Sequence, residues 1–305
     1  MTTGEKSYPT TVPPIRAPQR TDWLLLRHRI FSVLGRILLY VLLISGALIF
    51  SAPLLWMIST SLKPEGLVSQ YPIVWIPPEP KWSNFVTAWN KSSPSFTTFY
   101  YNTVYITILN MIGLVFSSSL VAFGFARIRF WGRNAIFMVL LATMMLPSQV
   151  TLIPIYLFWA KLGLVNTFWP LMAPEWLTNA YNVFLLRQFF LSINMELDDA
   201  ARIDGASWFR IYWNIIMPLS KPALGVIAIQ AFAFNWNNYF GPLIYLSEPK
   251  KLTIAIGLRL FATEQSQRIP ETMAMTLVAT IPVLVVFYIA QAKFIQGIVV
   301  SGVKG

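Results

Sequence analysis

The sequence predicts an all-α polytopic membrane protein with six transmembrane helices and a cytoplasmic helix-turn-helix. The chain has 305 residues, of which 56% are hydrophobic and only 11% are charged, a balance typical of proteins whose solvent is a lipid bilayer. Long uncharged segments are separated by short groups of charged residues. One such group, residues 196–222, combines charged and helix-forming residues between two apolar segments.

The N-terminal region predicts an arm followed by a membrane helix. Residues 1–35 are rich in Pro, Thr and Arg and have no apolar periodicity, so we expect a poorly ordered cytoplasmic arm. Ile37–Leu62 contains no charged residue and, as a helix, is longer than the ~30 Å hydrocarbon core. The first transmembrane helix is therefore expected at the start of a membrane domain over residues 36–296.

Proline content separates the next segments. Residues 63–94 contain too many prolines for a spanning helix, which predicts an external loop. The uncharged segment Phe96–Ala126 predicts the second span, and Asn134–Ala160 predicts the third. Pro147 lies inside the third span and Pro282 inside the sixth, where a kink can serve as a hinge or only as packing.

The fourth span is expected after a short turn at Lys161–Asn166, with interruptions at Pro170 and at Pro174-Glu175. Broken helices are tolerated in membranes only where protein or water satisfies the freed backbone groups. Residues 170–182 are therefore a candidate wall of a polar pathway. Glu175 is the one acidic residue within a predicted span, where it would accept a hydrogen bond in the pathway or lie among the external headgroups.

The remaining spans are predicted at Ala223–Leu246 and Thr272–Ile295, on either side of a polar external segment, Ser247–Glu271. Lys and Arg are concentrated in the segments that a cytoplasmic N-terminus also places in the cytoplasm, including Arg127, Arg129 and Arg133. The positive-inside rule therefore puts both termini and residues 194–222 in the cytoplasm. This topology accounts for the net charge of +11, and we expect no binding of nucleic acid.

Residues 194–222 predict two helices joined by a sharp turn. Asn194 is expected to cap the first helix, whose first turn is acidic. Asp204-Gly205 predicts the turn, because glycine adopts the backbone angles that end a helix. The second helix is expected to begin at Ala206-Ser207 and to be stopped by Pro218. From these features alone, the segment can be a connecting loop or a contact surface for another protein.

The same loop carries a family pattern. Asp199-Ala200-Ala201, followed by Asp204-Gly205-Ala206 and by Pro218, resembles the EAA loop of permease subunits of ATP-binding-cassette importers, in the maltose-transporter-type carbohydrate branch. Asp199 stands where that family usually has Glu. The resemblance implies a type I importer permease fold, in which this loop is the coupling helix that seats in a cleft of the ATPase subunit. It assigns ATPase coupling to Glu196, Asp199, Ala200, Ala201, Asp204, Gly205, Ala206 and Pro218.

The resemblance also implies partners. They are a second permease subunit in a heterodimer, two ATPase subunits and an extracytoplasmic substrate-binding protein, assembled in the bilayer of a bacterial cell membrane. The tail, residues 297–305, is similar to that of maltose-type permeases, which reaches between the ATPase subunits, and its expected contact residues are Gly302, Val303, Lys304 and Gly305. The sequence has no G-x-x-x-x-G-K-[ST] loop, so ATP and Mg are expected in the partner ATPase subunits, with no cofactor bound by this chain.

A run of amide and aromatic residues lies in the fifth predicted span. Buried amides need hydrogen-bond partners, so this group either faces a polar cavity, where amides and aromatic rings would bind a sugar, or joins helices to one another. Asn238 stands where the family's W-N-[DE] segment usually has an acid. The candidate pathway residues are Gln230, Asn235, Trp236, Asn237, Asn238, Tyr239, Asn179 and Asn182.

The leading functional hypothesis is a permease subunit that forms half of the translocation pathway for a sugar or oligosaccharide, by alternating access driven by separate ATPase subunits. An importer of glycerol phosphate or another polyol derivative would use the same mechanism. The alternatives of another class are a membrane-embedded glycosyl transferase and a passive channel or scaffold. An enzyme needs a nucleophile, base or metal cluster at membrane depth, but the predicted spans contain no cysteine, no histidine and no paired carboxylates. We therefore expect no catalytic residue and no metal site.

Overall fold

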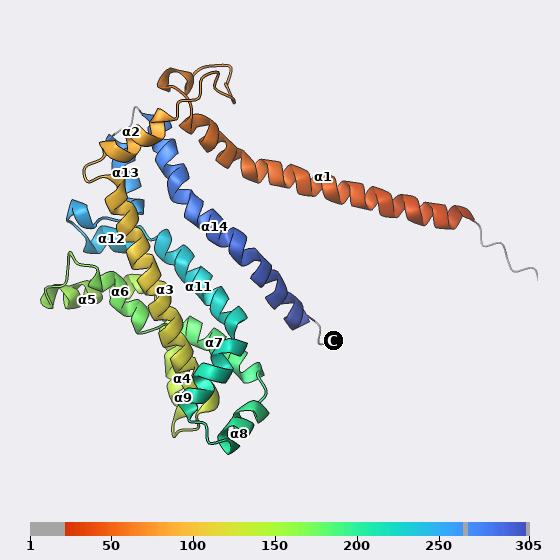
Figure 1. Cartoon of the computed structure of the whole chain (residues 1–305), viewed down its shortest axis with the longest axis vertical. Helices are drawn as coiled ribbons and strands as arrows, with labels where there is room; N and C mark the ends of the chain where they lie inside the picture. Colours follow the sequence, from red (N-terminus) through yellow and green to blue (C-terminus); the bar gives the residue numbers. More distant parts are fainter. Residues whose placement is uncertain (1–21, 265–267, 303–305) are drawn as a thin grey trace, which may run out of the picture. The chain divides into compact units, whose positions relative to one another are not determined.

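The computed structural model describes the backbone of residues 22–264 and 268–302 and the side chains of residues 30–263 and 268–291. The described residues form helices joined by turns and loops, and none of them lies in a β-strand (Figure 1). The chain divides into two compact units, residues 1–55 and residues 56–305. Helix α1 (Asp22–Ser61) accounts for the described part of the first unit, and the following helices belong to the second.

The second unit contains helices of very different length. The shortest are single turns in loops, whereas α3 and α14 are long enough to cross a membrane. In chain order they are η1 (Glu65–Leu67), α2 (Ser83–Lys91), α3 (Phe96–Arg127), α4 (Arg133–Ala142), η2 (Thr143–Met145), α5 (Ser148–Lys161), α6 (Trp169–Trp176), α7 (Ala180–Ser192), α8 (Glu196–Ile203), α9 (Trp208–Ile211), η3 (Tyr212–Ile216), α10 (Met217–Leu219), α11 (Lys221–Trp236), α12 (Phe240–Tyr245), η4 (Pro249–Lys251), α13 (Ile254–Glu264) and α14 (Ile269–Gly302).

Several helices have the length and apolar composition of membrane spans. Among the described residues, the continuous candidates are Ile30–Ser61, Phe96–Arg127 and Ile269–Gln291. Two more candidates are bent pairs, Arg133–Met145 with Ser148–Lys161 at 98° and Trp208–Leu219 with Lys221–Trp236 at 79°. The fourth predicted span corresponds to α6 and α7, which are each too short to cross a bilayer alone. Helices thus lie in all of the predicted spanning regions, and the breaks between them are the main departure from straight spans.

Helix α3 lies at the centre of the second unit. It packs against α6, α7 and α11, and near its N-terminus against α2 and α13 (Figure 1). One hydrophobic cluster surrounds its C-terminal half and includes Phe123 with Leu186 of α7 and Ile227 of α11. A second surrounds its N-terminal half and includes Phe99 with Met275 of α14. Helix α3 is therefore the element of the second unit against which α2, α6, α7, α11 and α13 pack.

The two ends of the chain differ from the prediction. Helix α1 begins at Asp22, inside the expected arm of residues 1–35, because Leu, Ile, Phe and Val recur from there and extend the apolar helix upstream. Helix α14 continues through Gly302, inside the expected tail of residues 297–305. The predicted contact residues Val303, Lys304 and Gly305 lie outside the described residues.

The third and fourth spans break at other positions than expected. Pro147 is the N-cap residue of α5, so it separates two helices where a kink within one was predicted. Pro170 lies in the first turn of α6, where its missing N–H has no helical partner to lose. Pro174 lies inside the same helix, and the break follows at Leu177–Asn179. The prolines that suggested the interruption therefore do not form it.

The fifth span and the segment after it are also corrected. Helix α11 ends at Trp236, and the short α12 follows, so the predicted span Ala223–Leu246 is broken near its end. The expected polar segment Ser247–Glu271 contains the amphipathic helix α13, which buries Ile254 and Phe261. The charged residues that precede and follow this helix concealed its apolar face from the sequence analysis.

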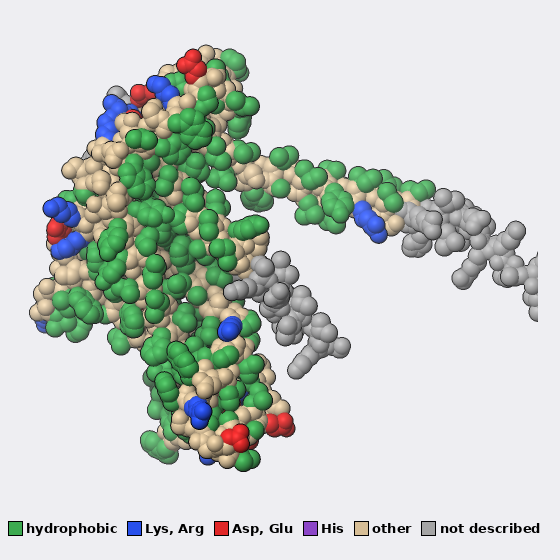
Figure 2. All heavy atoms as spheres, viewed as in Figure 1, with side chains coloured by type: hydrophobic (Ala, Val, Ile, Leu, Met, Phe, Trp, Pro, Cys, Tyr) green, Lys and Arg blue, Asp and Glu red, His purple; other side chains and the backbone are tan. Residues whose placement is uncertain are grey.

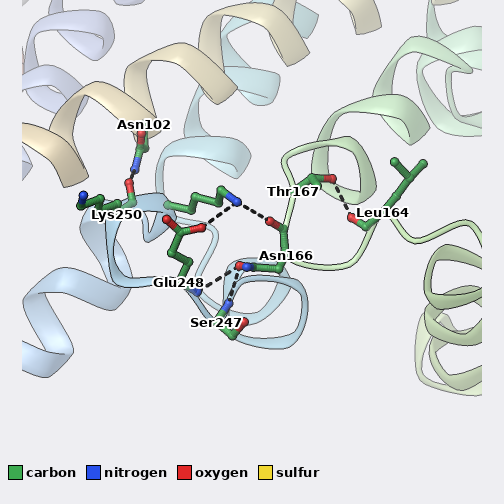
Figure 3. A network of polar contacts seen from close by, with 8 residues as sticks. Asn102, Leu164, Asn166, Thr167, Ser247, Glu248 and Lys250 are labelled. Atoms are coloured by element: carbon green, nitrogen blue, oxygen red, sulfur yellow. Dashed lines mark hydrogen bonds and ion pairs between the residues drawn. The ribbon is translucent and has the colours of Figure 1, made fainter.

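A polar junction joins the turn before α6 to the segment after α12 (Figure 3). Asn166 has a left-handed backbone with φ 62°, and its Oδ1 accepts hydrogen bonds from the N–H groups of Ser247 and Glu248 at 3.1 and 3.0 Å. Its carbonyl oxygen accepts a hydrogen bond from Lys251 Nζ at 3.0 Å. Lys251 also forms an ion pair with Glu248 at 2.7 Å. These contacts hold the turn before α6 against the segment after α12.

Close packing of α13 against α3 depends on Gly257. A Cβ atom at Gly257 would overlap the ring of Phe99, whose side chain is only 3% exposed. We expect Gly257→Ala to lower the free energy of unfolding by about 1–3 kcal/mol, because the buried ring must move to accept the methyl group. The thermal unfolding midpoint of the purified protein in detergent measures this effect.

Gly124→Ala is the matched control for that substitution. Gly124 lies in α3, and a Cβ atom there would meet nothing within 4 Å. Alanine is the better helix former, so this variant should keep or raise the midpoint. An equal decrease for both variants would contradict the close approach of α13 to α3.

Candidate functional site

The first helix of the predicted loop begins close to where the sequence indicated. The side chain of Asn194 accepts a hydrogen bond from the Glu196 N–H at 3.1 Å, while Met195 occupies the N-cap position of α8. The first turn carries Glu196, Asp198 and Asp199, which are favourable at the positive end of a helix. Capping by Asn194 therefore acts one residue outside the position that was expected.

The turn after α8 is a hydrogen-bonded helix end of the Schellman type. Gly205 has φ +79°, its N–H donates to Arg202 at 3.0 Å, and the Ala206 N–H donates to Ala201 at 2.9 Å. A side chain at Gly205 would be strained by this backbone conformation even though the space around it is open. The prediction of a glycine turn at Asp204-Gly205 is confirmed.

The second helix ends one residue later than predicted and is less regular. Ser207 caps it by accepting a hydrogen bond from the Arg210 N–H at 3.3 Å. After one α-helical turn, the π-helical segment η3 leads into α10, and Pro218 lies inside α10 without ending it. Pro218 has no N–H to return to the preceding turn, which is consistent with a widened helix before it. The helix ends at Leu219, and a 79° bend leads into α11.

Most predicted coupling residues of α8 and its turn are exposed. Glu196, Asp199, Ala200, Asp204 and Gly205 are exposed, as is Pro218, whereas Ala201 and Ala206 are half-buried against the core cluster. Two apolar residues that the sequence analysis did not select share this surface, Leu197 at 45% exposure and Ile203 at 87%. In Figure 2, acidic side chains gather at the end of the unit that carries α8. The exposed face of α8 is therefore both acidic and apolar.

One acidic residue of α8 is buried, and the sequence analysis missed its role. Arg127, at the end of α3, places Nε 3.0 Å from Oδ2 of Asp198, and the two side chains are 0% and 1% exposed. Arg127 Nη2 also donates to the Ile193 carbonyl at 2.9 Å, and Nη1 contacts Sδ of Met195 at 2.6 Å. In the sequence, this pair was indicated only by Arg127 at the end of the second predicted span and by Asp198 in the first turn of the loop helix.

The charge of Asp198 depends on this pairing. Within the described part of the chain, neither carboxylate oxygen of Asp198 accepts a hydrogen bond. Burial raises the pKa of the Asp198 carboxyl; the Arg127 guanidinium opposes this rise and the neighbouring Asp199 reinforces it. A buried charge left without its partner is strongly destabilising. Arg127 is therefore the group that permits a carboxylate at this position.

Aromatic side chains attach the second helix of the loop to the same element. The hydroxyl group of Tyr212 lies 2.8 Å from that of Ser119, and the Tyr212 ring centroid is 5.3 Å from that of Phe123. The ring of Trp208 lies 6.4 Å from Phe123, and the guanidinium of Arg202 lies 5.0 Å from the Trp208 ring. Both helices of the loop are thus packed against the C-terminal part of α3.

The amide group of the fifth span is divided by the structure. Asn235 is buried, accepts a hydrogen bond from Asn110 of α3 at 2.6 Å, and donates to Ala231 at 2.9 Å. Asn110 also donates to the Leu171 carbonyl of α6 at 2.9 Å. For Asn235, the interpretation as a contact between helices is therefore the one that the geometry favours. The Asn110 amide joins α3 to both α6 and α11, and Asn235 is its acceptor on α11.

The other members of that group have separate positions. Trp236 is buried and donates to the Ala279 carbonyl of α14 at 2.9 Å, and with the exposed Asn237 it lines a hollow of about 270 Å³. Asn238 accepts a hydrogen bond from the Gly241 N–H at 3.1 Å at the start of α12. Gln230 and Tyr239 are exposed. Trp236 and Asn237 thus line one hollow, whereas Asn235 forms a contact between helices.

The break between α6 and α7 contains the remaining candidates. Asn179 is exposed and caps α7 by accepting a hydrogen bond from the N–H of the buried Asn182 at 3.0 Å. Thr178 has a left-handed backbone with φ 67°, and its hydroxyl group contacts that of Ser118 on α3. Asn179 also lines a hollow with residues of α4 and η2. Asn179 therefore lies exposed beside a hollow, whereas Asn182 is part of the packed interior.

The described residues contain no cluster of three or more His, Asp or Glu side chains that could hold a metal ion, and the sequence has no cysteine.

Known proteins share both the sequence and the fold of the chain. Residues 114–304 match the model of the family "Binding-protein-dependent transport system inner membrane component". A putative ABC transporter permease protein, ORF2, of Caldicellulosiruptor sp. is 33% identical over 87% of this chain and 96% of the relative. The arabinooligosaccharide permease AraQ of Halalkalibacterium halodurans is 32% identical over 83% and 91%. The sn-glycerol-3-phosphate permease UgpE of Yersinia pestis is 31% identical over 86% and 95%.

A solved structure has the same architecture. A chain of a bacterial ABC transporter that imports the acidic polysaccharide alginate is 25% identical, with a TM-score of 0.74 over 92% of this chain and 99% of that chain. The predicted fold class, an all-α polytopic importer permease, is confirmed by this likeness. The chain belongs to the family of binding-protein-dependent transport system inner membrane components, the permease subunits of ATP-binding-cassette importers.

Proposed function

We propose that the chain forms half of a translocation pathway for a sugar or oligosaccharide and works by alternating access. Its partners in this proposal are a second, different permease subunit, two ATPase subunits that bind ATP and Mg, and an extracytoplasmic substrate-binding protein. Both termini and the α8 loop lie in the cytoplasm. The chain itself is non-catalytic and binds no cofactor. ATP is hydrolysed in the ATPase subunits, and their movement is transmitted to this chain through the contact between the subunits.

The observation that carries this proposal is the exposed acidic and apolar face of α8. An isolated surface helix in water gains nothing from exposing Ile203 at 87% and Leu197 at 45%. Burial of these side chains in a cleft of another subunit removes apolar area from water, and the rigid glycine turn fixes the angle at which α8 is presented. A ligand-driven change in the ATPase subunits then moves this chain if the contact differs between their states.

The class of substrate rests on the relatives. The names of AraQ and of the alginate transporter favour a carbohydrate, and the name of UgpE supports a glycerol phosphate as the second candidate. Binding-protein-dependent uptake by the reconstituted complex, measured against a panel of oligosaccharides and glycerol phosphates, tests the proposal. Uptake of a carbohydrate is expected; uptake of glycerol 3-phosphate alone would favour the second candidate.

The docking role of α8 predicts an effect of charge on its apolar face. Ile203→Asp should weaken binding of the ATPase subunits by at least about tenfold, because a desolvated carboxylate would face the cleft. Copurification of the ATPase with the tagged chain, titrated by subunit concentration, measures this. Ile76→Asp is the matched control, since Ile76 is 85% exposed and lies in the predicted external loop. Equal loss of the ATPase in both variants would contradict the role of α8.

The turn at Gly205 predicts a difference between two substitutions. Gly205→Val should abolish uptake while leaving membrane insertion intact, because a β-branched residue is strained at φ +79°. Gly205→Asn should keep most of the uptake, since asparagine tolerates left-handed backbone angles. Uptake assays in cells, normalised to the amount of chain in the membrane, separate the two variants. Normal uptake by Gly205→Val would refute the coupling role of this turn.

A further inference from the structure

Three side chains of α3 form a single row that faces the α8 loop. Ser119, Phe123 and Arg127 are spaced four residues apart, so they lie on one face of the helix. Together they contact both helices of the loop. Arg127 pairs with Asp198 of α8, Phe123 contacts the rings of Trp208 and Tyr212, and Ser119 shares a hydrogen bond with the Tyr212 hydroxyl. We call Ser119, Phe123 and Arg127 the anchor row.

The helix that carries the anchor row also holds the opposite end of the unit. Asn102, near the N-terminus of α3, donates hydrogen bonds to the carbonyl groups of Lys250 and Leu252 at 2.9 and 3.0 Å, and Figure 3 shows its contact with Lys250. Between the two ends, Asn110 joins α3 to α6 and α11. Helix α3 thus connects the α8 loop to the junction around Asn166 by direct polar contacts.

The covalent connections of α8 are less direct. On one side α8 follows α7 through Ile193, which has an extended backbone with ψ 133°. On the other side it reaches α11 only through the glycine turn, the π-helical segment and a bend of 79°. A displacement of α8 is therefore transmitted most directly through its packed contacts, and the Arg127–Asp198 pair is the one among those described here that joins two buried, opposite charges.

We propose that the Arg127–Asp198 pair holds the coupling helix α8 against α3. The two helices then move as one rigid body and transmit the movement of the ATPase subunits to the membrane domain. Arg127 and Asp198 are positioning residues in this mechanism and contact neither nucleotide nor substrate. The inference rests on the proposed coupling function of α8. It assigns the transmission of force to α3, which is distant from α8 in sequence and close to it in space.

The test uses the whole complex, reconstituted into liposomes with its ATPase subunits and binding protein. The variants are Arg127→Met, Asp198→Leu and the double variant, with Arg127→Lys as the conservative change. Arg129→Met is the matched control. Arg129 lies two positions after Arg127, carries the same charge and has an exposed side chain. The measurements are the amount of ATPase retained, ATP hydrolysis stimulated by the binding protein, substrate taken up per ATP, and the unfolding midpoint.

Both single variants are expected to retain the ATPase and its stimulated hydrolysis while uptake per ATP falls about tenfold, the range of a typical coupling between sites. Arg127→Lys should give an intermediate value, because lysine keeps the charge but loses the forked contact to Asp198 and Ile193. The double variant should recover the unfolding midpoint, since no uncompensated buried charge remains, yet keep the low uptake per ATP. Arg129→Met should match the wild type.

Three outcomes would contradict these expectations. Wild-type uptake per ATP in the double variant or in Arg127→Met, at normal assembly, would overturn the role of the pair and leave the proposed function standing. Loss of ATPase binding together with uptake in the single variants, restored by the double variant, would show that the pair only stabilises the fold and would overturn the inference. Absence of ATP-dependent uptake by the wild-type complex would overturn the proposed function as well.

Discussion

The structure depends on one constraint: polar groups buried within a membrane domain must find partners inside the protein. Among the described residues, helix α3 carries more of the buried polar side chains than any other helix. Asn102 and Asn110 donate to carbonyl groups of other elements, Ser119 meets a tyrosine hydroxyl, and Arg127 pairs with a carboxylate. Each unpaired group of this kind would cost several kcal/mol in hydrocarbon. The apolar clusters contribute most of the buried surface area. The polar contacts determine which helix lies beside α3 and at which position along its axis.

This division explains how the chain combines stability with movement. Hydrophobic packing is not directional, so helices that share only apolar contacts can slide or tilt at modest cost. Directional hydrogen bonds from Asn110 to Asn235 and from Arg127 to the Ile193 carbonyl keep selected neighbours in register with α3. The helical spans are interrupted at Leu177–Asn179, between α6 and α7, and after Trp236, between α11 and α12. A unit of this kind can tilt as a body around fixed internal contacts.

The sequence predicted the fold class and the helical regions because long uncharged segments have few physical alternatives. It also located the glycine turn, since a φ of +79° at Gly205 suits glycine better than any other residue. It failed where tertiary contacts decide the outcome. Pro170 and Pro174 suggested a break that falls after them, and α13 was concealed by the charges around it. The Arg127–Asp198 pair was not predicted, because no local pattern links residues so far apart in the chain.

The junction at Asn166 restricts how related sequences can diverge. The residue at this position needs a left-handed backbone and a short side-chain acceptor that reaches two consecutive N–H groups, which favours Asn or Asp. Its N–H also donates to the Tyr245 carbonyl at 2.7 Å, so the opposite segment is held from Tyr245 to Lys251. An insertion or deletion within that segment would misalign every donor at once. The length of the segment Tyr245–Lys251 and the identity of the residue at position 166 are thus constrained by the same set of hydrogen bonds.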